Sequence, residues 1–250
     1  MPRADEHAPS MPGTAGTAAK PNQFKLVIRI RMATIEVPVG TASGSEEIWS
    51  YLDEEPISTV RSVSLGRNGI RVGLGRQDAW PDLAAVFKRM TGRAPGQSVI
   101  AAMPNDPLQI TLQQHRDEAT IFTFRDDRTL RGQDYPVGDY LLTIACTLDE
   151  DDLSKVMMTA LPQVRSSART TRFEISPLGP QMVTQPELFS LSDLTFQLMI
   201  PPKGFLLIGP GANARNPSTA GHHFLTHTRE GVEFETLLML MPEVLATPIR

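Results

Sequence analysis

Apolar and polar residues alternate along the chain from Phe24, where the first strand pattern begins. The apolar positions are Phe24, Leu26, Ile28, Ile30 and Met32, and most of the residues between them are basic. This period of two predicts a strand with one buried face and one wet face. Ile35 and Val37 continue the pattern on odd positions, so we expect a β-bulge near Ala33-Thr34.

Asn68-Gly69 lies between two short apolar runs, Val63–Arg67 and Ile70–Leu74. Asn-Gly adopts the positive φ angles of a two-residue type I′ turn. Closing that turn would set Leu65 opposite Val72 on one face of a hairpin. The sequence therefore predicts a hairpin at this point.

Residues 79–90 carry the one convincing helical pattern. Asp78 can cap its start, Pro81 is tolerated in its first turn and Gly92 is available to end it. The apolar stripe consists of Trp80, Leu83, Ala84, Phe87 and Met90. This pattern predicts a single helix packed on the sheets.

Further apolar runs, separated by turn residues, predict most of the remaining strands. They are 98–103, 108–113, 118–124, 139–148, 153–161, 194–200, 204–209 and 233–241. Residues 165–193 are polar and interrupted by proline, so we expect a long loop with at most a short strand at Arg172–Ile175. The fold class is mainly β (α+β), with residues 1–22 as a disordered tail or linker and 23–250 as one domain.

Two apolar segments echo each other, because both end in Pro-x-Val at Pro162 and Pro242. Proline cannot donate to a sheet ladder, so both are expected to mark strands leaving a sheet. Leu237–Met241 is a run of consecutive apolar residues, which predicts a strand buried on both faces.

The composition of the chain argues against several classes of function. Hydrophobic residues make up 40% and charged residues 21%, with a formal net charge of −4, which describes a globular chain without general attraction to nucleic acid. The one cysteine, Cys146, lies in an apolar run and is expected to be buried. We find no membrane-helix pattern and no secretory signal pattern at the N-terminus.

The best candidate for a metal site is the group His222, His223 and His227. On a strand, His223 and His227 would lie roughly 13 Å apart, too far to share an ion, whereas a helix would bring them together. Pro217, Gly221 and Gly231 favour a loop, so we expect polar surface histidines and no metal.

Other motifs give still weaker indications of a binding or catalytic site. Gly209–Arg215 lacks the Gly-Lys-Ser/Thr ending of a phosphate loop, and Gly73 and Gly75 lack the third glycine of a dinucleotide fingerprint. The acidic clusters at 46–47, 53–55 and 149–152 have no EF-hand spacing. No catalytic residue and no cofactor is therefore expected.

The order of these segments resembles the C-terminal core of bacterial secretins, the ring-forming proteins of outer-membrane secretion and pilus systems. Three pieces carry the resemblance: Gly138–Asp149 followed by Val156–Val164, Leu198–Gly209 with its turn glycine Gly204, and Phe234–Val244 with Pro242. Upstream, Leu26–Val37, the helix at 79–90, Val99–Pro104 and Glu118–Ile121 follow in the same order.

The chain also departs from the secretin pattern. Only 15 residues separate Phe124 from Tyr140, too few for the long gate hairpin of secretins. Gly209-Pro210-Gly211 stands in place of a double glycine, and the N-terminal ring-building modules have no counterpart.

The resemblance implies a non-catalytic structural protein of the bacterial envelope, in the periplasm or at the outer membrane. It would form a homo-oligomeric ring or lattice, with itself and other envelope proteins as partners. In secretins the membrane-facing hairpin occupies the interval of 165–193, but Arg165, Arg169 and Arg172 favour a peripheral or soluble ring over a pore here. The alternatives are a monomeric or dimeric adaptor, and a metal-dependent hydrolase using the histidines at 222–227.

Overall fold

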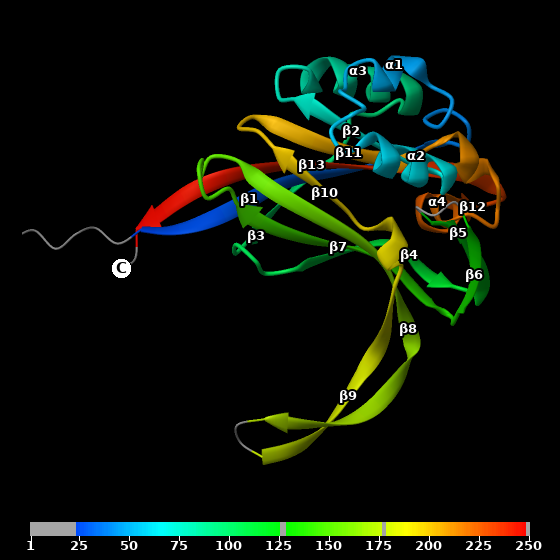
Figure 1. The fold of residues 1–250 in the computed structure, drawn as a ribbon. Coiled ribbons are helices and arrows are strands. Elements are labelled where there is room, and N and C mark those ends of the chain that lie inside the picture. The colour runs from blue at the N-terminus through cyan, green and yellow to red at the C-terminus, as the bar shows by residue number, and fades with distance from the viewer. Residues whose placement is uncertain (1–23, 126–128, 177–178, 249–250) are drawn as a thin grey trace, which may run out of the picture.

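Two packed β-sheets form the molecule, with the helices at 46–49 and 80–91 on the outer face of the first sheet (Figure 1). The computed structural model describes residues 24–125, 129–176 and 179–248, so the tail predicted at 1–22 lies outside the described residues. The first sheet has the strand order β2-β11-β13-β1-β3, with β12 paired to β13. The second has the order β10-β8-β7-β4, with β9 paired to β8, and β5 and β6 form a separate pair. The mainly β fold class is confirmed.

The strands are β1 (Phe24–Pro38), β2 (Ile70–Arg76), β3 (Gln97–Ala102), β4 (Leu108–Arg116), β5 (Ala119–Phe124), β6 (Leu130–Tyr135), β7 (Gly138–Leu148), β8 (Val156–Ser176), β9 (Gly179–Ser190), β10 (Phe196–Ile200), β11 (Gly204–Pro210), β12 (Thr226–Arg229) and β13 (Val232–Pro248). The helices are α1 (Glu46–Trp49), α2 (Thr59–Arg67), α3 (Trp80–Thr91) and α4 (Ala220–Leu225), with 3-10 turns η1 (Ser192–Leu194) and η2 (Ala212–Arg215).

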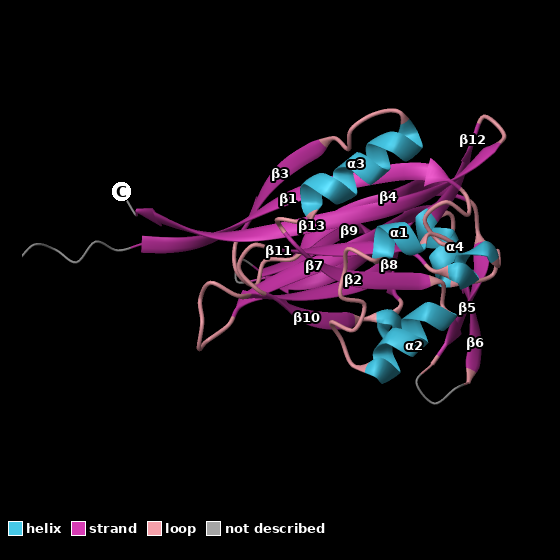
Figure 2. Cartoon of the chain, turned by 90° about the horizontal axis from the view of Figure 1, so that it is seen from above, coloured by secondary structure: helices cyan, strands magenta, loops and turns pink. Residues whose placement is uncertain are grey.

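β1 is one unbroken strand, and the predicted bulge at Ala33-Thr34 is wrong. It pairs with β13 from Phe24 to Pro38 without a shift in register. The buried residues of β1 have even numbers in its first half and odd numbers in its second half, because the two halves are covered on opposite faces of the sheet. Ile28 and Ile30 pack between the two sheets, whereas Ile35 and Val37 pack beneath α1 and α3, which lie across this half of the sheet (Figure 2).

β13 is the central strand of the first sheet, and the prediction that it is buried on both faces is confirmed. Leu238 and Leu240 point into the core between the sheets. Leu237, Met239 and Met241 point toward the helices on the opposite face. Side chains of alternate parity can both be apolar only where both faces of a sheet are covered, and this is such a place.

The predicted helix at 79–90 is confirmed as α3. Gly92 ends it in the left-handed conformation, at φ 75°. Asp78 does not cap it, because the N-cap position belongs to Ala79 and Asp78 instead pairs with Arg76 at 3.2 Å. The three other helices show that α3 is not the only one.

The hairpin predicted at Asn68-Gly69 is wrong, because the first of its two strands is helix α2. Ser58 caps this helix by accepting a hydrogen bond from the Arg61 amide. Leu65 is buried while Val63 is exposed, a contrast that the helix explains and a strand would not, because residues two apart share one face of a strand. The positive φ of Gly69, 78°, ends a helix and does not turn a hairpin.

The loop predicted at 165–193 is also wrong, although the short strand predicted at Arg172–Ile175 lies within β8. β8 runs on to Ser176, and β9 returns beside it, so the interval is mostly a two-stranded ribbon. Much of this ribbon packs on no core, so its sequence carries little of the burial pattern on which strand prediction depends.

Both prolines of the echoed segments lie inside strands. Pro162 pairs with Leu142 of β7, and Pro242 pairs with Ile30 of β1. On its other edge, β8 changes neighbours near Pro162, from β10 to β9. β11 pairs with β13 only over Leu238–Leu240. These prolines therefore stand where a neighbouring strand ends, and not where their own strand leaves the sheet.

Candidate interaction sites

Asn68 and Gly69 form the point at which several distant segments meet. The fully buried Asn68 amide donates to the carbonyls of Ser64 and Phe124, both at 2.8 Å, and its side-chain oxygen accepts from the Phe124 amide at 2.8 Å. The Asn68 carbonyl accepts from the Gly221 amide at 2.7 Å. One side chain thus joins α2 to β5, while its backbone holds α4.

Glycine is required on both sides of this junction. A Cβ on Gly69 would lie 2.7 Å from the backbone nitrogen of Ala214, and a Cβ on Gly221 would lie 2.1 Å from the Gly69 carbonyl oxygen. Asn68 and Gly69 therefore lie at a tightly packed junction between segments, and not in the turn of the predicted hairpin. Gly204 and Gly209 lie in β11, where Gly209 lets Trp49 and Leu237 pack against the strand.

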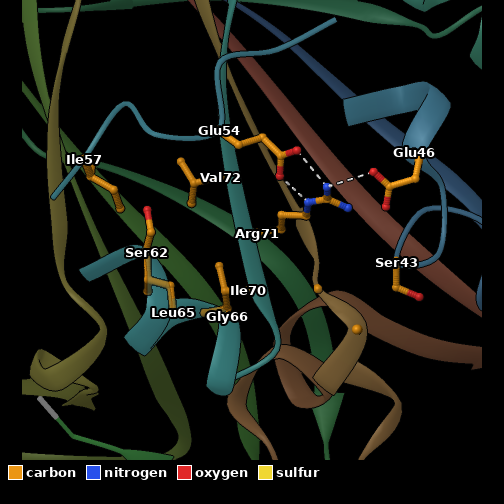
Figure 3. Close-up of a pocket in the computed structure, with 12 residues that line it drawn as sticks. Ser43, Glu46, Glu54, Ile57, Ser62, Leu65, Gly66, Ile70, Arg71 and Val72 are labelled. Atoms are coloured by element: carbon orange, nitrogen blue, oxygen red, sulfur yellow. Dashed lines mark hydrogen bonds and ion pairs between the residues drawn. The ribbon is translucent and has the colours of Figure 1, made fainter. Parts of the chain in front are cut away.

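β2 is one of the two outer strands of the first sheet, and a groove of about 380 Å³ lies along it. Ile57, Ser62 and Leu65 line one side of this groove, and Glu46, Glu54 and Ser43 line the other (Figure 3). Ile70, Arg71 and Val72 of β2 form its floor. We call it the β2 groove.

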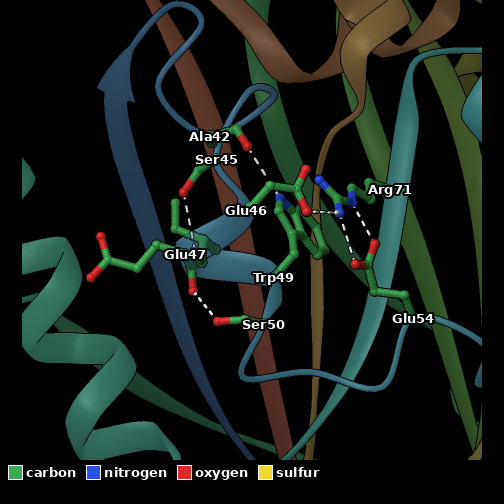
Figure 4. A network of polar contacts seen from close by, with 9 residues as sticks. Ala42, Ser45, Glu46, Glu47, Trp49, Ser50, Glu54 and Arg71 are labelled. Carbon is green, nitrogen blue, oxygen red and sulfur yellow. Dashed lines mark hydrogen bonds and ion pairs between the residues drawn. The ribbon is translucent and has the colours of Figure 1, made fainter.

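Arg71 organises the acidic side of the β2 groove (Figure 4). Its guanidinium makes two hydrogen bonds to Glu54, at 2.5 and 2.7 Å, and lies 4.6 Å from the ring centroid of Trp49. Glu46, which is 92% exposed, approaches Arg71 only to 4.0 Å. The arginine is held by one carboxylate, and the second remains available at the rim.

The loop before α1 is fixed in place by a buried carboxylate on β13. Glu235, with no exposed surface, accepts hydrogen bonds from the amides of Ala42 and Ser43, at 2.7 and 3.0 Å. The Trp49 indole donates to the Ala42 carbonyl at 3.1 Å. The wall of the β2 groove at Ser43 is thus tied to the central strand of the sheet.

The ribbon of β8 and β9 projects from the body as an arm (Figure 1). β7 pairs with β8 only as far as Ser166, so residues 169–176 of β8 have β9 alone beside them. Phe173 lies opposite Met182, and Ile175 lies opposite Pro180, so these four side chains share one face. Phe173 is 77%, Ile175 93% and Met182 66% exposed.

The other face of the arm is mostly polar, with Val183 as its one apolar residue among those paired between Thr170 and Glu174. Arg172 pairs with Glu187 at 3.4 Å across the two strands. The arm is therefore amphipathic, with an exposed apolar face that we call the arm face, made of Phe173, Ile175, Met182 and Pro180.

Two further outer strands carry little of the charge that usually protects a sheet edge, although the pairing of β4 with β7 shifts register on either side of Gln113. β3 ends the first sheet and β4 ends the second. β3 contains no charged residue and no proline, and β4 contains none before Arg116. Soluble proteins commonly place charges or prolines on such strands to prevent pairing with other chains.

The three histidines at 222–227 point to different partners. His222 and His223 lie in α4 and not in the predicted loop, because Thr219 caps a short helix there. The ring of His222 contacts the Ala214 carbonyl at 3.1 Å, His223 stacks on Tyr140, and His227 stacks on Phe234 and lies 3.4 Å from Glu36. Within the described residues, no group of histidine, cysteine and acidic side chains is arranged to hold a metal ion.

The other residues considered as candidates for chemistry are buried in the core, packed in a strand or paired with basic side chains. Burial raises the pKa of the Cys146 thiol to about 11, which leaves it a poor nucleophile. Gly75 lies in β2, where the ring of Phe205 fills the space of a side chain. Glu47 pairs with Arg89, and Asp152 pairs with Lys155. Among the described residues, no helix is long and apolar enough to cross a membrane.

The arm face and the β2 groove were not predicted from the sequence. Phe173 and Ile175 alternate with polar residues, a signal for a strand that the prolines around them obscured. Arg71 and Glu54 are 17 positions apart and carry no motif.

Comparisons with known proteins add little to these observations. No protein-family model matches the chain, and no curated protein matches it. Among solved structures, the chain is similar to the InvG secretin domain β-barrel from the Salmonella SPI-1 injectisome NC-base, at 8% identity and a TM-score of 0.16. The match covers 90% of this chain and 61% of that one, and a superposition this weak carries no argument about fold or function.

Proposed function

We propose that this protein is a non-catalytic structural protein whose copies assemble into a closed homo-oligomeric ring. The observation that carries the proposal is the arm face, because Phe173, Ile175 and Met182 expose large apolar side chains at the end of a projecting ribbon. Burying one such side chain is worth roughly 1.5–3 kcal/mol. In a monomer these side chains would stay exposed to water, and the stabilisation from burying them would not be gained.

The partner that fits this arm best is a second copy of the chain. The ribbon has open hydrogen-bonding edges beyond Ser166, and the body of every copy offers further open strands in β3 and β4. Those two strands carry no charge over most of their length. Joining edges between copies would remove the unpaired backbone groups that each copy exposes alone.

A head-to-tail arrangement of copies follows from the asymmetry of these surfaces. The arm and the strands β3 and β4 are different parts of the molecule, so a contact between them is head-to-tail, and such contacts close into rings when the rotation between copies permits. The placement in a bacterial envelope, and with it a role in secretion or pilus systems, rests on the resemblance of the strand order to secretins.

The arm face can be tested directly. We expect the wild-type protein at micromolar concentration to scatter light as an oligomer and to give ring-shaped particles in micrographs. Phe173→Ser with Ile175→Ser should shift the population to monomer, because it removes the apolar contact without altering a buried residue.

A matched control is available on α2, where Val60 and Val63 are also exposed but lie outside the arm. Val60→Ser with Val63→Ser should leave the oligomer intact. A wild-type protein that stays monomeric at every concentration, with and without detergent, would contradict the assembly and favour the adaptor.

A further inference from the structure

The outward edge of β2 is only partly covered. Asp53 and Leu74 exchange two backbone hydrogen bonds, at 2.9 and 2.8 Å, on the side of β2 that faces away from β11. Backbone groups of an antiparallel strand point to alternate sides, so Val72 and Ile70 direct their N–H and C=O groups the same way as Leu74. Both residues lie in the β2 groove, beyond the end of the Asp53 bridge.

The walls of the β2 groove differ on the two sides of the sheet. Leu65 and Ile57 pack with Val72 around the core between the sheets. Glu54 and Glu46 lie on the side of Arg71, whose guanidinium covers Trp49. A strand laid along β2 would alternate its side chains between these walls, one toward the apolar wall and the next toward the carboxylates.

We propose that the β2 groove binds an extended peptide with alternating apolar and basic side chains, which adds to the sheet as a strand beside β2. Strand addition at an open sheet edge draws affinity from backbone hydrogen bonds, and the pockets on either side select the side chains. α2 forms the outer wall through Ser62, Leu65 and Gly66.

The charge of the groove selects the basic residues. Glu54 neutralises Arg71 through two hydrogen bonds, which leaves the carboxylate of Glu46 in excess at the rim. A lysine or arginine beside Glu46 and Glu54 gains from both, while an acidic side chain in that place would be repelled. This surface is separate from the arm face, so the inference does not depend on assembly.

The probe is a fluorescent synthetic peptide, Thr-Lys-Val-Lys-Val-Lys-Thr, titrated into the full-length protein and followed by anisotropy. We expect saturable binding, weakened about tenfold, or about 1.4 kcal/mol, by Glu46→Lys and by the charge-reversed peptide Thr-Glu-Val-Glu-Val-Glu-Thr. Ser62→Phe should abolish binding by filling the groove, whereas Thr59→Phe, on the exposed end of the same helix, should leave it unchanged.

Hydrogen exchange of single amides gives a test without mutation. In the free protein the Val72 amide should exchange faster than the Gly73 amide, which faces β11, and adding the peptide should slow Val72 specifically. Equal affinity for the acidic peptide, unchanged binding by the Ser62→Phe protein, or a Val72 amide that the peptide does not protect would each overturn the proposal.

Discussion

Gly69 and Gly92 adopt nearly the same left-handed backbone, with φ of 78° and 75°, but their surroundings differ. A Cβ on Gly92 would meet nothing within 4 Å, whereas one on Gly69 would lie 2.7 Å from Ala214. Gly92→Ala should therefore cost only the left-handed strain, about 1 kcal/mol. Gly69→Ala should cost about 2–4 kcal/mol, because overpacking against rigid backbone adds to that strain.

Urea unfolding of both variants checks this comparison. The difference between the two costs isolates the close approach of Gly69 to η2, since the backbone strain is common to both. Equal losses of stability would show that the junction at Asn68-Gly69 relaxes around a methyl group.

His223 should make stability depend on pH. Burial, with smaller contributions from His222 and Arg116, lowers its pKa from 6.5 to about 4. Between about pH 4 and 6.5 the unfolded chain binds a proton that the folded protein does not, so stability rises with pH across this window and is fully present above 6.5. His223→Phe, which keeps the stack on Tyr140, should flatten this rise by on the order of 1–2 kcal/mol, a value reduced for partial solvent exposure.

Thermal unfolding of the wild-type and His223→Phe proteins at several pH values measures the effect. The same pH profile in both would assign the dependence to other groups.

The residue-level signal at Asn68-Gly69 shows what a dipeptide can predict. The positive φ of Gly69 was correctly expected, because glycine adopts it without a steric cost. The same conformation serves hairpin turns and helix ends, however, and the choice between them depends on the contacts of Asn68 with Phe124, which is 56 positions away.

Among the elements, β13 is the one on which the first sheet depends. It pairs with β1 along its length and with β11 at Leu238–Leu240, and Leu237–Met241 fill both cores. A chain ending after Gly231 should fail to fold, because losing five buried apolar side chains, at roughly 1.5–3 kcal/mol each, removes most or all of a typical net stability of about 5–15 kcal/mol.

The matched truncation removes only residues 245–250. At this end β13 pairs with β1 alone, beyond β11 and beyond the core, so the shortened chain should still unfold cooperatively. Circular dichroism and heat denaturation compare the two chains. A soluble, cooperatively folded chain ending at Gly231 would contradict the central role of β13.

Elements with a buried face were the ones that the sequence predicted well. α3 shows its stripe at Trp80, Leu83 and Phe87 because all three are buried, and Leu237–Met241 shows an unbroken run because both faces are covered. The second half of α2 was predicted as a strand because Val63 and Leu65 alternate with small residues, although Val63 lies on the exposed side of the helix. The arm was mistaken for a loop because its apolar residues face solvent.

At the scale of the whole molecule, the surfaces that could bind partners are where prediction from sequence was weakest. The β2 groove needs Glu54 and Arg71 to meet across a fold, and the arm face needs two strands to pair in register. Neither arrangement has a local pattern, since both depend on tertiary pairing. The strand order that resembles secretins indicated an assembly, but not which surface would form it.

Closure of the assembly can be distinguished from open-ended growth by its mass. In the proposed assembly the arm face would contact the outer strand β3 or β4 of the next copy head-to-tail, which gives one discrete mass if the ring closes and a continuous distribution if it does not. Closing the ring adds one contact between copies without binding a further copy, which stabilises the ring relative to open chains. A closed ring should therefore keep the same mass over a tenfold dilution and then dissociate into monomers. We expect mass photometry of the wild-type protein to show this pair of species. Masses that increase steadily with concentration would replace the ring with a filament or lattice.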